Sequence, residues 1–364
     1  MNPFMIDVRQ ADIDDLKRRL ADTRFPDEVE NAGWDYGTSI PFLRKLVEHW
    51  RTRFDWRKEE ARLNGFRHFT TELDGERVHF IHASGAGGNA TPILLANGWP
   101  SNFVELLPLV PLLTRELDGR SFDVVIPSIP GFGFSTPLVG ADWTIARVAR
   151  TFDALMRRLG YAGYGAHGSD AGALVSRELA VLNPDGFLGA HVLQLFSFPS
   201  GDPSEFEKFT AKDHAALEFL GWFQSVGGYN TMNGTRPQTI AAALSDSPVG
   251  QLAYNELFEN FGNGTSLVSA EQVLTQASLY WLTNTSATAV RYHFAEGRAG
   301  GGPVVSHGRI GVAVFADDFQ TIRPLAERDN TRIEHWAEYP TGGHYAALEV
   351  PDVLVADLRT FFAG

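Results

Sequence analysis

Gly168-Ser169-Asp170-Ala171-Gly172-Ala173 decides the fold of this chain. The stretch lies between an apolar run at 161–166 and a helix-like run at 174–182. A strand that turns sharply into a helix needs small residues two positions either side of the tip, because the backbone there is strained and closely packed. Gly168 and Gly172 fill those positions around Asp170. The stretch therefore predicts a nucleophile elbow with a carboxylate nucleophile, which forms an ester that water must then cleave.

A second loop accompanies such an elbow. Residues 93–100, Ile-Leu-Leu-Ala-Asn-Gly-Trp-Pro, form a short buried-strand pattern that ends in a Gly-x-Pro turn. The oxyanion hole next to a nucleophile elbow takes one backbone N–H from this kind of loop and one from the residue after the nucleophile. We therefore assign the two donors to Trp99 and Ala171.

An acid and a histidine follow in the order that the elbow requires. An apolar strand pattern at 310–315 runs into Ala316-Asp317-Asp318, and Thr341-Gly342-Gly343-His344 comes later. Nucleophile, acid and histidine in this order are typical of an α/β-hydrolase, in which each group follows the carboxyl end of a strand. The sequence predicts a triad of Asp170, His344 and one of the two neighbouring acids.

The chain divides into three regions. Residues 1–75 predict an amino-terminal helical arm that wraps the core. Residues 76–196 and 303–364 alternate strand and helix patterns, which predicts an α/β core with a mostly parallel central sheet and helices on both faces. Residues 197–302 show long helical runs with aromatic residues, which predicts an inserted helical lid. Strands are expected at 79–82, 93–96, 123–127, 163–166, 189–195 and from 310 onward.

Composition excludes several classes of site and partner. The chain of 364 residues has no Cys, which excludes disulfides, thiol catalysis and Cys-ligated zinc. Its net charge of −13 disfavours nucleic acid and anionic lipid. No apolar run reaches the ~18 residues of a membrane span, and eight acidic residues among the first thirty are untypical of a signal or transit peptide. We expect a cytoplasmic protein that acts on a neutral or cationic small molecule; a homodimer is left open.

An ordered set of segments extends over nearly the whole chain. It comprises residues 3–8 and 12–27, Gly98-Trp99-Pro100, Pro130-Gly131-Phe132-Gly133-Phe134-Ser135, Gly228-Tyr229, Thr235-Arg236-Pro237-Gln238-Thr239, residues 245–250, Leu279-Tyr280-Trp281-Leu282-Thr283, and Gly342-Gly343-His344-Tyr345 with residues 346–349. In this set the chain resembles the epoxide hydrolases of the α/β-hydrolase family that carry an amino-terminal epoxide hydrolase region, as the microsomal enzymes and many bacterial relatives do.

The resemblance implies hydrolysis of a hydrophobic epoxide to a vicinal diol, without cofactor or metal. Asp170 attacks an epoxide carbon, and His344, oriented by an acid, activates the water that cleaves the ester. The family's acid falls three residues after the final Phe of its strand, which favours Asp318 over Asp317. Two lid tyrosines of the family donate to the epoxide oxygen, and Tyr229 stands where the first is expected.

The second lid donor has two candidates. Counting forward from residues 280–283 without gaps places His293 at the family's tyrosine position, one residue after Tyr292. One helical step turns a side chain by ~100°. Either His293 donates as an imidazolium, or the register slips and Tyr292 serves as the catalytic donor. The lid aromatics Trp222 and Trp281 are assigned, with His293, to substrate binding.

Two positions depart from the family pattern. Asn97 replaces the usual His before Gly-x-Pro, and Ala171 replaces the common Trp after the nucleophile, which leaves room for a bulkier substrate. A haloalkane dehalogenase is an alternative, but the missing indole N–H and the arm argue against it. A third hypothesis is a non-hydrolytic protein of this fold that binds or cyclises a hydrophobic metabolite. It stays open because Asn97 and the displaced lid tyrosine depart from the family pattern.

Overall fold

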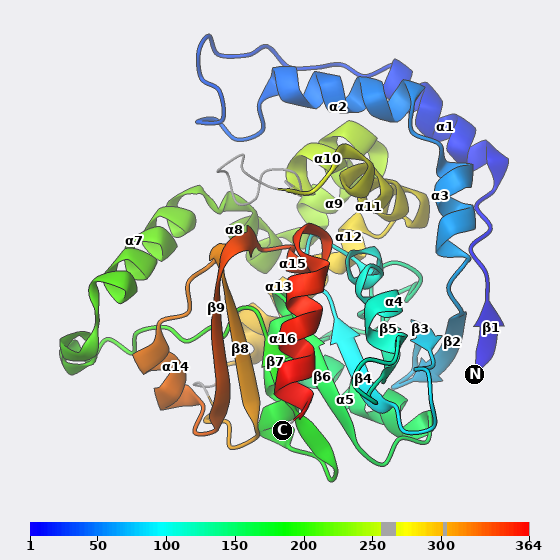
Figure 1. Cartoon of the computed structure of the whole chain (residues 1–364). Helices are drawn as coiled ribbons and strands as arrows, with labels where there is room; N and C mark the ends of the chain where they lie inside the picture. Colours follow the sequence, from blue (N-terminus) through cyan, green and yellow to red (C-terminus); the bar gives the residue numbers. More distant parts are fainter. Residues whose placement is uncertain (256–266, 301–303, 364) are drawn as a thin grey trace.

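The computed structural model describes residues 1–255, 267–300 and 304–363. Within these residues nine strands form one sheet in the order β1-β2-β3-β5-β4-β6-β7-β8-β9 (Figure 1). The strands from β5 to β9 in this order are parallel, and β1, β2 and β3 extend one edge antiparallel. The predicted mostly parallel central sheet is confirmed. The strands are β1 Asn2–Phe4, β2 His68–Leu73, β3 Glu76–Ala83, β4 Thr91–Ala96, β5 Phe122–Pro127, β6 Tyr164–Gly168, β7 Phe187–Val192, β8 Ile310–Asp317 and β9 Ile333–Gly343.

Helices cover both faces of the sheet, which explains the continuous apolar run of the central strands. In β4, Ile93 and Leu95 pack in the cluster that contains Leu354 of α16, whereas Leu94 and Ala96 pack in the cluster that contains Phe152 of α5. Alternate side chains point to opposite faces of a strand, so both sets of β4 must be apolar. The covering helices are α4 Leu109–Thr114, α5 Ile145–Arg158, α6 Ala171–Leu182, α14 Arg323–Asp329, α15 Ala346–Glu349 and α16 Pro351–Ala363.

The predicted strands agree with the structure to within a few residues. β6 begins at Tyr164, one residue after the predicted start at 163, and β7 ends at Val192 rather than at 195. Three strands were not predicted. β1 is three residues long at one edge of the sheet, β2 beside it carries the mixed run His-Phe-Thr-Thr-Glu-Leu, and β9 at the other edge contains Pro340 and is mostly half-exposed or exposed. Strands of mixed polarity at or next to an edge lack the apolar alternation that marks a strand in sequence.

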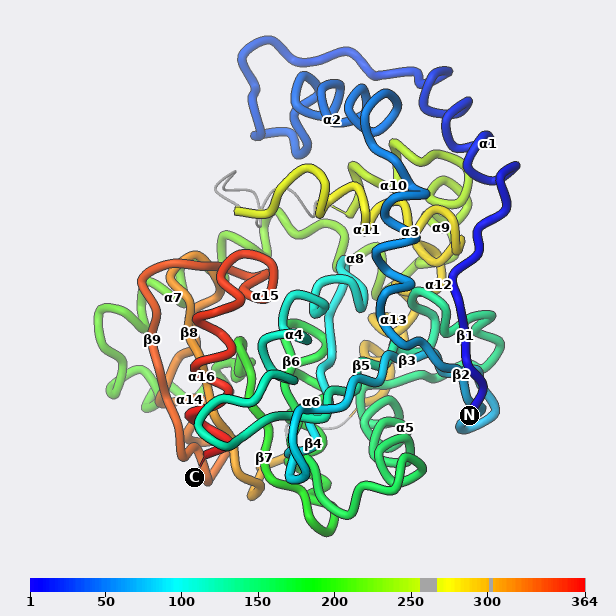
Figure 2. The backbone as a smooth tube through the Cα atoms, turned by 45° about the vertical axis from the view of Figure 1, so that its right-hand side comes forward, coloured from blue at the N-terminus to red at the C-terminus, as the bar shows by residue number. Residues whose placement is uncertain are grey.

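The amino-terminal arm packs on both the core and the lid: Ile13, Trp56 and Leu63 of the arm share one cluster with Ile93 and Leu95 of β4, and other arm residues share a second cluster with the lid. Its helices are α1 Gln10–Ala21, α2 Ile40–Thr52 and α3 Trp56–Leu63. Leu20 of α1 and Val47 of α2 share a cluster with Leu252 and Leu274 of the lid. Figures 1 and 2 both show α1 and α2 beside α10 and α11 at the top of the molecule. The expected helical arm is thus present, but β1 and β2 at its two ends belong to the sheet.

The lid between β7 and β8 is helical, as expected. Its helices are α7 Ala211–Val226, α8 Gly228–Thr235, α9 Pro237–Asp246, α10 Pro248–Asn255, α11 Ala270–Thr283, α12 Ser286–Ala289 and α13 Arg291–Ala299. The predicted end of the lid at residue 302 lies outside the described residues. Across the described chain, no helix combines the length and the apolar character that crossing a bilayer requires.

Four histidines are buried in two pairs within the sheet. His68 Nδ1 lies 2.9 Å from His79 Nε2, and His167 Nδ1 lies 2.9 Å from His191 Nδ1. Burial lowers the pKa of all four rings. The unfolded chain therefore binds protons near pH 6.5 that the folded chain does not bind.

We expect the free energy of unfolding to be highest above about pH 6.5 and to fall as the pH drops below it, by up to ~1.4 kcal/mol per pH unit for each histidine. Chemical denaturation between pH 5 and pH 8 measures this slope. His68→Gln should reduce the slope, whereas His214→Gln, at an exposed position, should not. Equal stability at pH 5.5 and pH 7.5 would contradict the assignment of neutral buried rings.

Candidate active site

Asp170 stands at the tip of a strained turn between β6 and α6. Its backbone has φ 52° and ψ −122°, a conformation that costs a non-glycine residue energy and is concentrated at functional sites. A Cβ at Gly168 would lie 2.0 Å from the Gly172 carbonyl oxygen, and one at Gly172 would lie 1.9 Å from the Ala96 carbonyl oxygen. Both glycines are therefore required by close backbone contacts.

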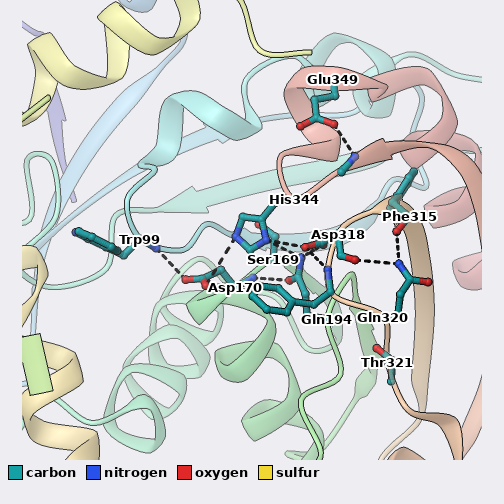
Figure 3. A network of polar contacts seen from close by, with 12 residues as sticks. Trp99, Ser169, Asp170, Gln194, Phe315, Asp318, Gln320, Thr321, His344 and Glu349 are labelled. Carbon is teal, nitrogen blue, oxygen red and sulfur yellow. Dashed lines mark hydrogen bonds and ion pairs between the residues drawn. The ribbon is translucent and has the colours of Figure 1, made fainter. Parts of the chain in front are cut away.

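The loop after β4 presents a backbone donor to the Asp170 carboxylate. The Trp99 N–H donates to Asp170 Oδ1 at 3.0 Å (Figure 3), and the Ala171 N–H also hydrogen-bonds this carboxyl group. A Cβ at Gly98 would lie 2.3 Å from Asp170 Oδ1, so only glycine lets the loop come this close. Desolvation beneath the lid raises the pKa of Asp170, against the opposing effects of His344 and the two N–H groups.

His344 follows β9 and lies between the two acids. Its Nδ1 is 2.9 Å from Asp318 Oδ1, and its Nε2 is 3.8 Å from Asp170 Oδ2. Asp318 is buried, whereas Asp317 is exposed. Burial alone lowers the pKa of the His344 ring, but the charges of Asp318, Asp170 and Glu105 outweigh it, and the pKa is raised. The structure thus brings Asp170, His344 and Asp318 together, and it brings Asp318 rather than Asp317 to the ring.

Two buried polar residues that support these groups were missed by the sequence interpretation. Gln194, just beyond β7, accepts from the Asp170 N–H at 2.6 Å and donates to Asp318 Oδ2. Glu105, in the 3-10 helix Phe103–Leu106, accepts from the hydroxyls of Ser101 and Ser169. The available signal was a single polar residue inside an apolar run. It gives no periodic pattern, and the partners of such a residue come from distant parts of the chain.

The loop that carries His344 is held by a hydrogen bond to a side chain of α15. The backbone N–H of Gly343 donates to Glu349 Oε2 at 2.5 Å (Figure 3).

The Asn97 side chain hydrogen-bonds within its own loop, since its Nδ2 donates to the Gly98 carbonyl oxygen at 2.9 Å, and it is fully buried. Asn97 therefore lies under the oxyanion loop and does not face the space above Asp170.

A cavity of about 690 Å³ lies above Asp170 between core and lid. Its walls are largely apolar and aromatic, with a few polar groups. The residues that line it include Trp99, Asp170, Ala171, Leu174, Phe196, Phe223, Tyr229, Tyr292, His293 and Phe319. The volume suits a small organic molecule, and the side of the cavity at Ala171 and Leu174 carries no indole ring.

Tyr229, Tyr292 and His293 all line this cavity. The Tyr229 ring packs on Trp99 with centroids 4.9 Å apart. Burial raises the pKa of Tyr292 well above its usual value, and the next causes are the charges of Asp170 and Tyr229, so the Tyr292 hydroxyl lies within electrostatic reach of both. Burial lowers the pKa of His293 to about 4, which leaves this ring neutral at pH 7.

The ungapped count that pointed to His293 crosses two breaks in the helices. Asn284 has φ 52° at the end of α11, and Val290 separates α12 from α13. A helical register cannot be carried through such breaks. The ungapped count therefore does not fix which of Tyr292 and His293, both of which line the cavity, takes the position that it assigned to His293.

The two tryptophans assigned to substrate binding lie elsewhere. Trp222 on α7 is 41% exposed, and its ring packs beside Phe219 at 5.4 Å. Trp281 on α11 lies under the Arg19 guanidinium, at 5.4 Å, in the contact between arm and lid. Neither is among the described residues that line the cavity. An aromatic side chain on a lid helix contacts the arm, the solvent or the cavity according to its face, which the sequence alone did not resolve.

Within the described chain, potential metal ligands gather at one place, where α16 packs on β7 and β9. His191, His335 and Asp357 bring ligand atoms within 4.8 Å of one another. His191 Nε2 and His335 Nε2 lie 2.7 Å and 2.8 Å from the two oxygens of the Asp357 carboxylate, and the Tyr339 hydroxyl donates to it as well. The hydrogen bonds satisfy the carboxylate and attach α16 to β7 and β9.

Known proteins resemble this chain over its whole length. A family model for the epoxide hydrolase N terminus matches residues 1–106, and one for the alpha/beta hydrolase fold matches residues 91–267. A protein of Stigmatella aurantiaca (strain DW4/3-1), provisionally named an epoxide hydrolase, is 39% identical over 100% of this chain and 84% of its own length. Epoxide hydrolase 1 of Sus scrofa is 31% identical over 99% of this chain and 88% of its own.

Solved structures that resemble this chain are also those of epoxide hydrolases. The structure of Aspergillus niger epoxide hydrolase superposes with a TM-score of 0.87 at 30% identity, covering 100% of this chain and 96% of the other. The likeness therefore includes the arm, the core and the lid. On this identity and coverage the chain belongs to the epoxide hydrolase family of the α/β-hydrolase fold.

Proposed function

We propose that this enzyme hydrolyses a hydrophobic epoxide to a vicinal diol through an ester on Asp170. The observation that carries the proposal is the arrangement around one carboxylate. Asp170 Oδ1 accepts from the Trp99 N–H, whereas Oδ2 is the oxygen nearer the His344 ring. Oδ2 is therefore the attacking atom, and Oδ1 becomes the carbonyl oxygen of the ester, already held by the Trp99 N–H, one of the donors that later stabilise an oxyanion.

The first step opens the ring. Asp170 Oδ2 forms a bond to one epoxide carbon, the C–O bond of that carbon breaks, and the departing oxygen takes a proton from a lid hydroxyl. Tyr229 and Tyr292 line the cavity above the nucleophile and serve as these donors. A phenol suits the task because its neutral form persists at pH 7.

The second step cleaves the ester. Esterification removes the charge of Asp170, which is one of the charges that raise the pKa of His344. The pKa of the ring therefore falls once the ester has formed, and the ring becomes able to take a proton from water. That water attacks the Asp170 carbonyl carbon, and the N–H groups of Trp99 and Ala171 stabilise the oxyanion. Collapse of this intermediate releases the diol, whose oxygen takes the proton from His344. The proton left on the Asp170 carboxyl group passes to the lid phenolate, which restores both Asp170 and the lid tyrosine for the next turnover.

The shape and chemistry of the cavity support an apolar substrate. Phe196, Phe223 and Phe319 form much of its wall, and Ala171 leaves space beside the nucleophile. In dehalogenases that resemble this fold the position after the nucleophile supplies an indole N–H to the halide, and Ala171 has none. The proposal is tested by incubating the protein with a panel of aryl and alkyl epoxides and haloalkanes. Diol formation from epoxides supports it; halide release alone, or no turnover of any substrate, would contradict it.

A further inference from the structure

Glu105 is a buried carboxyl group that the reaction described above does not use. It lies in the 3-10 helix Phe103–Leu106 and is 1% exposed, within an otherwise apolar turn. A carboxyl group at such a position is costly to the fold unless it is hydrogen-bonded. Its contacts therefore indicate why the fold retains it.

Both oxygens of Glu105 are bound to loops that form the oxyanion hole. Ser169 Oγ donates to Glu105 Oε1 at 3.0 Å, and Ser101 Oγ donates to Oε2. Ser169 immediately precedes Asp170, and Ser101 follows Trp99 by two residues. One carboxylate thus joins the loop that presents the Trp99 N–H to the elbow that presents the Ala171 N–H.

Glu105 also interacts electrostatically with the reacting groups. Burial raises its pKa to about 7, and among the charged neighbours Asp170 raises it further while His344 lowers it. Its charge in turn contributes to the raised pKa of His344. The tyrosines Tyr280 and Tyr345 face it from α11 and from the start of α15. The charges of Glu105 and His344 therefore each affect the pKa of the other group.

We propose that Glu105 is a positioning residue for ester hydrolysis, which fixes the spacing of the two oxyanion donors and favours the imidazolium that His344 becomes. This inference rests on the proposed Asp170 ester. It assigns Glu105 to the second step, since the oxyanion and the imidazolium both arise when water attacks. The first step needs neither of them.

The test compares the two steps in Glu105→Gln. In single turnover with a substrate of the native protein, the rate constant for ester formation should stay within about 3-fold of the native value. The rate constant for ester hydrolysis should fall by ~10-fold or more, because loss of one oxyanion donor costs ~10²–10³ and a displaced donor keeps only part of its effect. The acidic limb of the native pH profile should include the ionisation of Glu105 near pH 7, and the limb of Glu105→Gln should lose that component, because no charge then appears beside His344 as the pH rises.

Glu76→Gln is the matched control. Glu76 is also buried, but it accepts from the backbone of Val139 and Gly140, away from the site. This variant should lose stability without changing the limb. If Glu105→Gln does not fold, Ser169→Ala removes one of the two contacts and should slow hydrolysis selectively.

Two results separate the possible failures. An unchanged hydrolysis rate constant and an unchanged limb in folded Glu105→Gln, or unchanged hydrolysis in Ser169→Ala, would overturn the role of Glu105 and leave the ester mechanism intact. Absence of any ester in the native protein would instead overturn the proposed function.

Discussion

His344→Gln is expected to accumulate the Asp170 ester. Attack by the carboxylate needs no base, whereas hydrolysis does, and a general base typically contributes ~10²–10⁴ in rate. The variant should therefore consume about one epoxide per active site and then stop. Intact-protein mass spectrometry should show a gain equal to the mass of the epoxide, and peptide mapping should place the adduct on Asp170.

The neighbouring acids provide a matched pair of variants. Asp318→Asn removes the carboxylate that lies 2.9 Å from His344 Nδ1 and should slow ester hydrolysis strongly. Asp317→Asn, at an exposed position one residue earlier, should leave it nearly unchanged. Equal effects of the two would contradict the assignment of Asp318.

The double variant Asp170→Asn with His344→Gln tests the nucleophile and should show no adduct. An adduct on this variant would contradict Asp170 as the nucleophile.

Removal of a lid phenol is expected to slow ester formation by ~10²–10⁴, since each hydroxyl stabilises the departing oxygen. Tyr229→Phe and Tyr292→Phe should both show this loss in single-turnover alkylation. His293→Phe should show a much smaller one, because a ring with a pKa of about 4 is not an imidazolium donor at pH 7.

The pH dependence separates the two candidates for the second donor. Burial holds the pKa of Tyr292 well above its usual value of 10, so the phenol keeps its proton and alkylation should show no alkaline limb below pH 9. An imidazolium donor at His293 would be lost as the pH rises through its pKa. Loss of alkylation in His293→Phe, with Tyr292→Phe unaffected, would contradict the assignment.

The elbow and its surroundings could be predicted from sequence because their rules are local. Gly168 and Gly172 are required by contacts within a few residues of the turn or with the adjacent strand, and the strand patterns at 93–96 and 310–315 mark where the loops begin. The triad order then followed from known fold topology.

The parts that could not be predicted depend on tertiary contacts. Gln194 and Glu105 are single polar residues whose partners lie on other strands and loops, so no spacing in the sequence identifies them. The position of Tyr292 depends on the break at Val290, and the destination of Trp281 depends on the arm that packs over the lid. Propensity and periodicity describe single elements and do not predict how two elements meet.

The most direct test of the mechanism follows the oxygen of water through one turnover. Native protein in excess over the epoxide should be mixed in water enriched in ¹⁸O, and both the diol and the Asp170 peptide should be analysed. Because water attacks the ester carbonyl carbon, the label should enter the Asp170 carboxylate, and the diol of the first turnover should be unlabelled. Labelled diol in the first turnover, with Asp170 unlabelled, would mean direct attack of water on the epoxide and would contradict the mechanism.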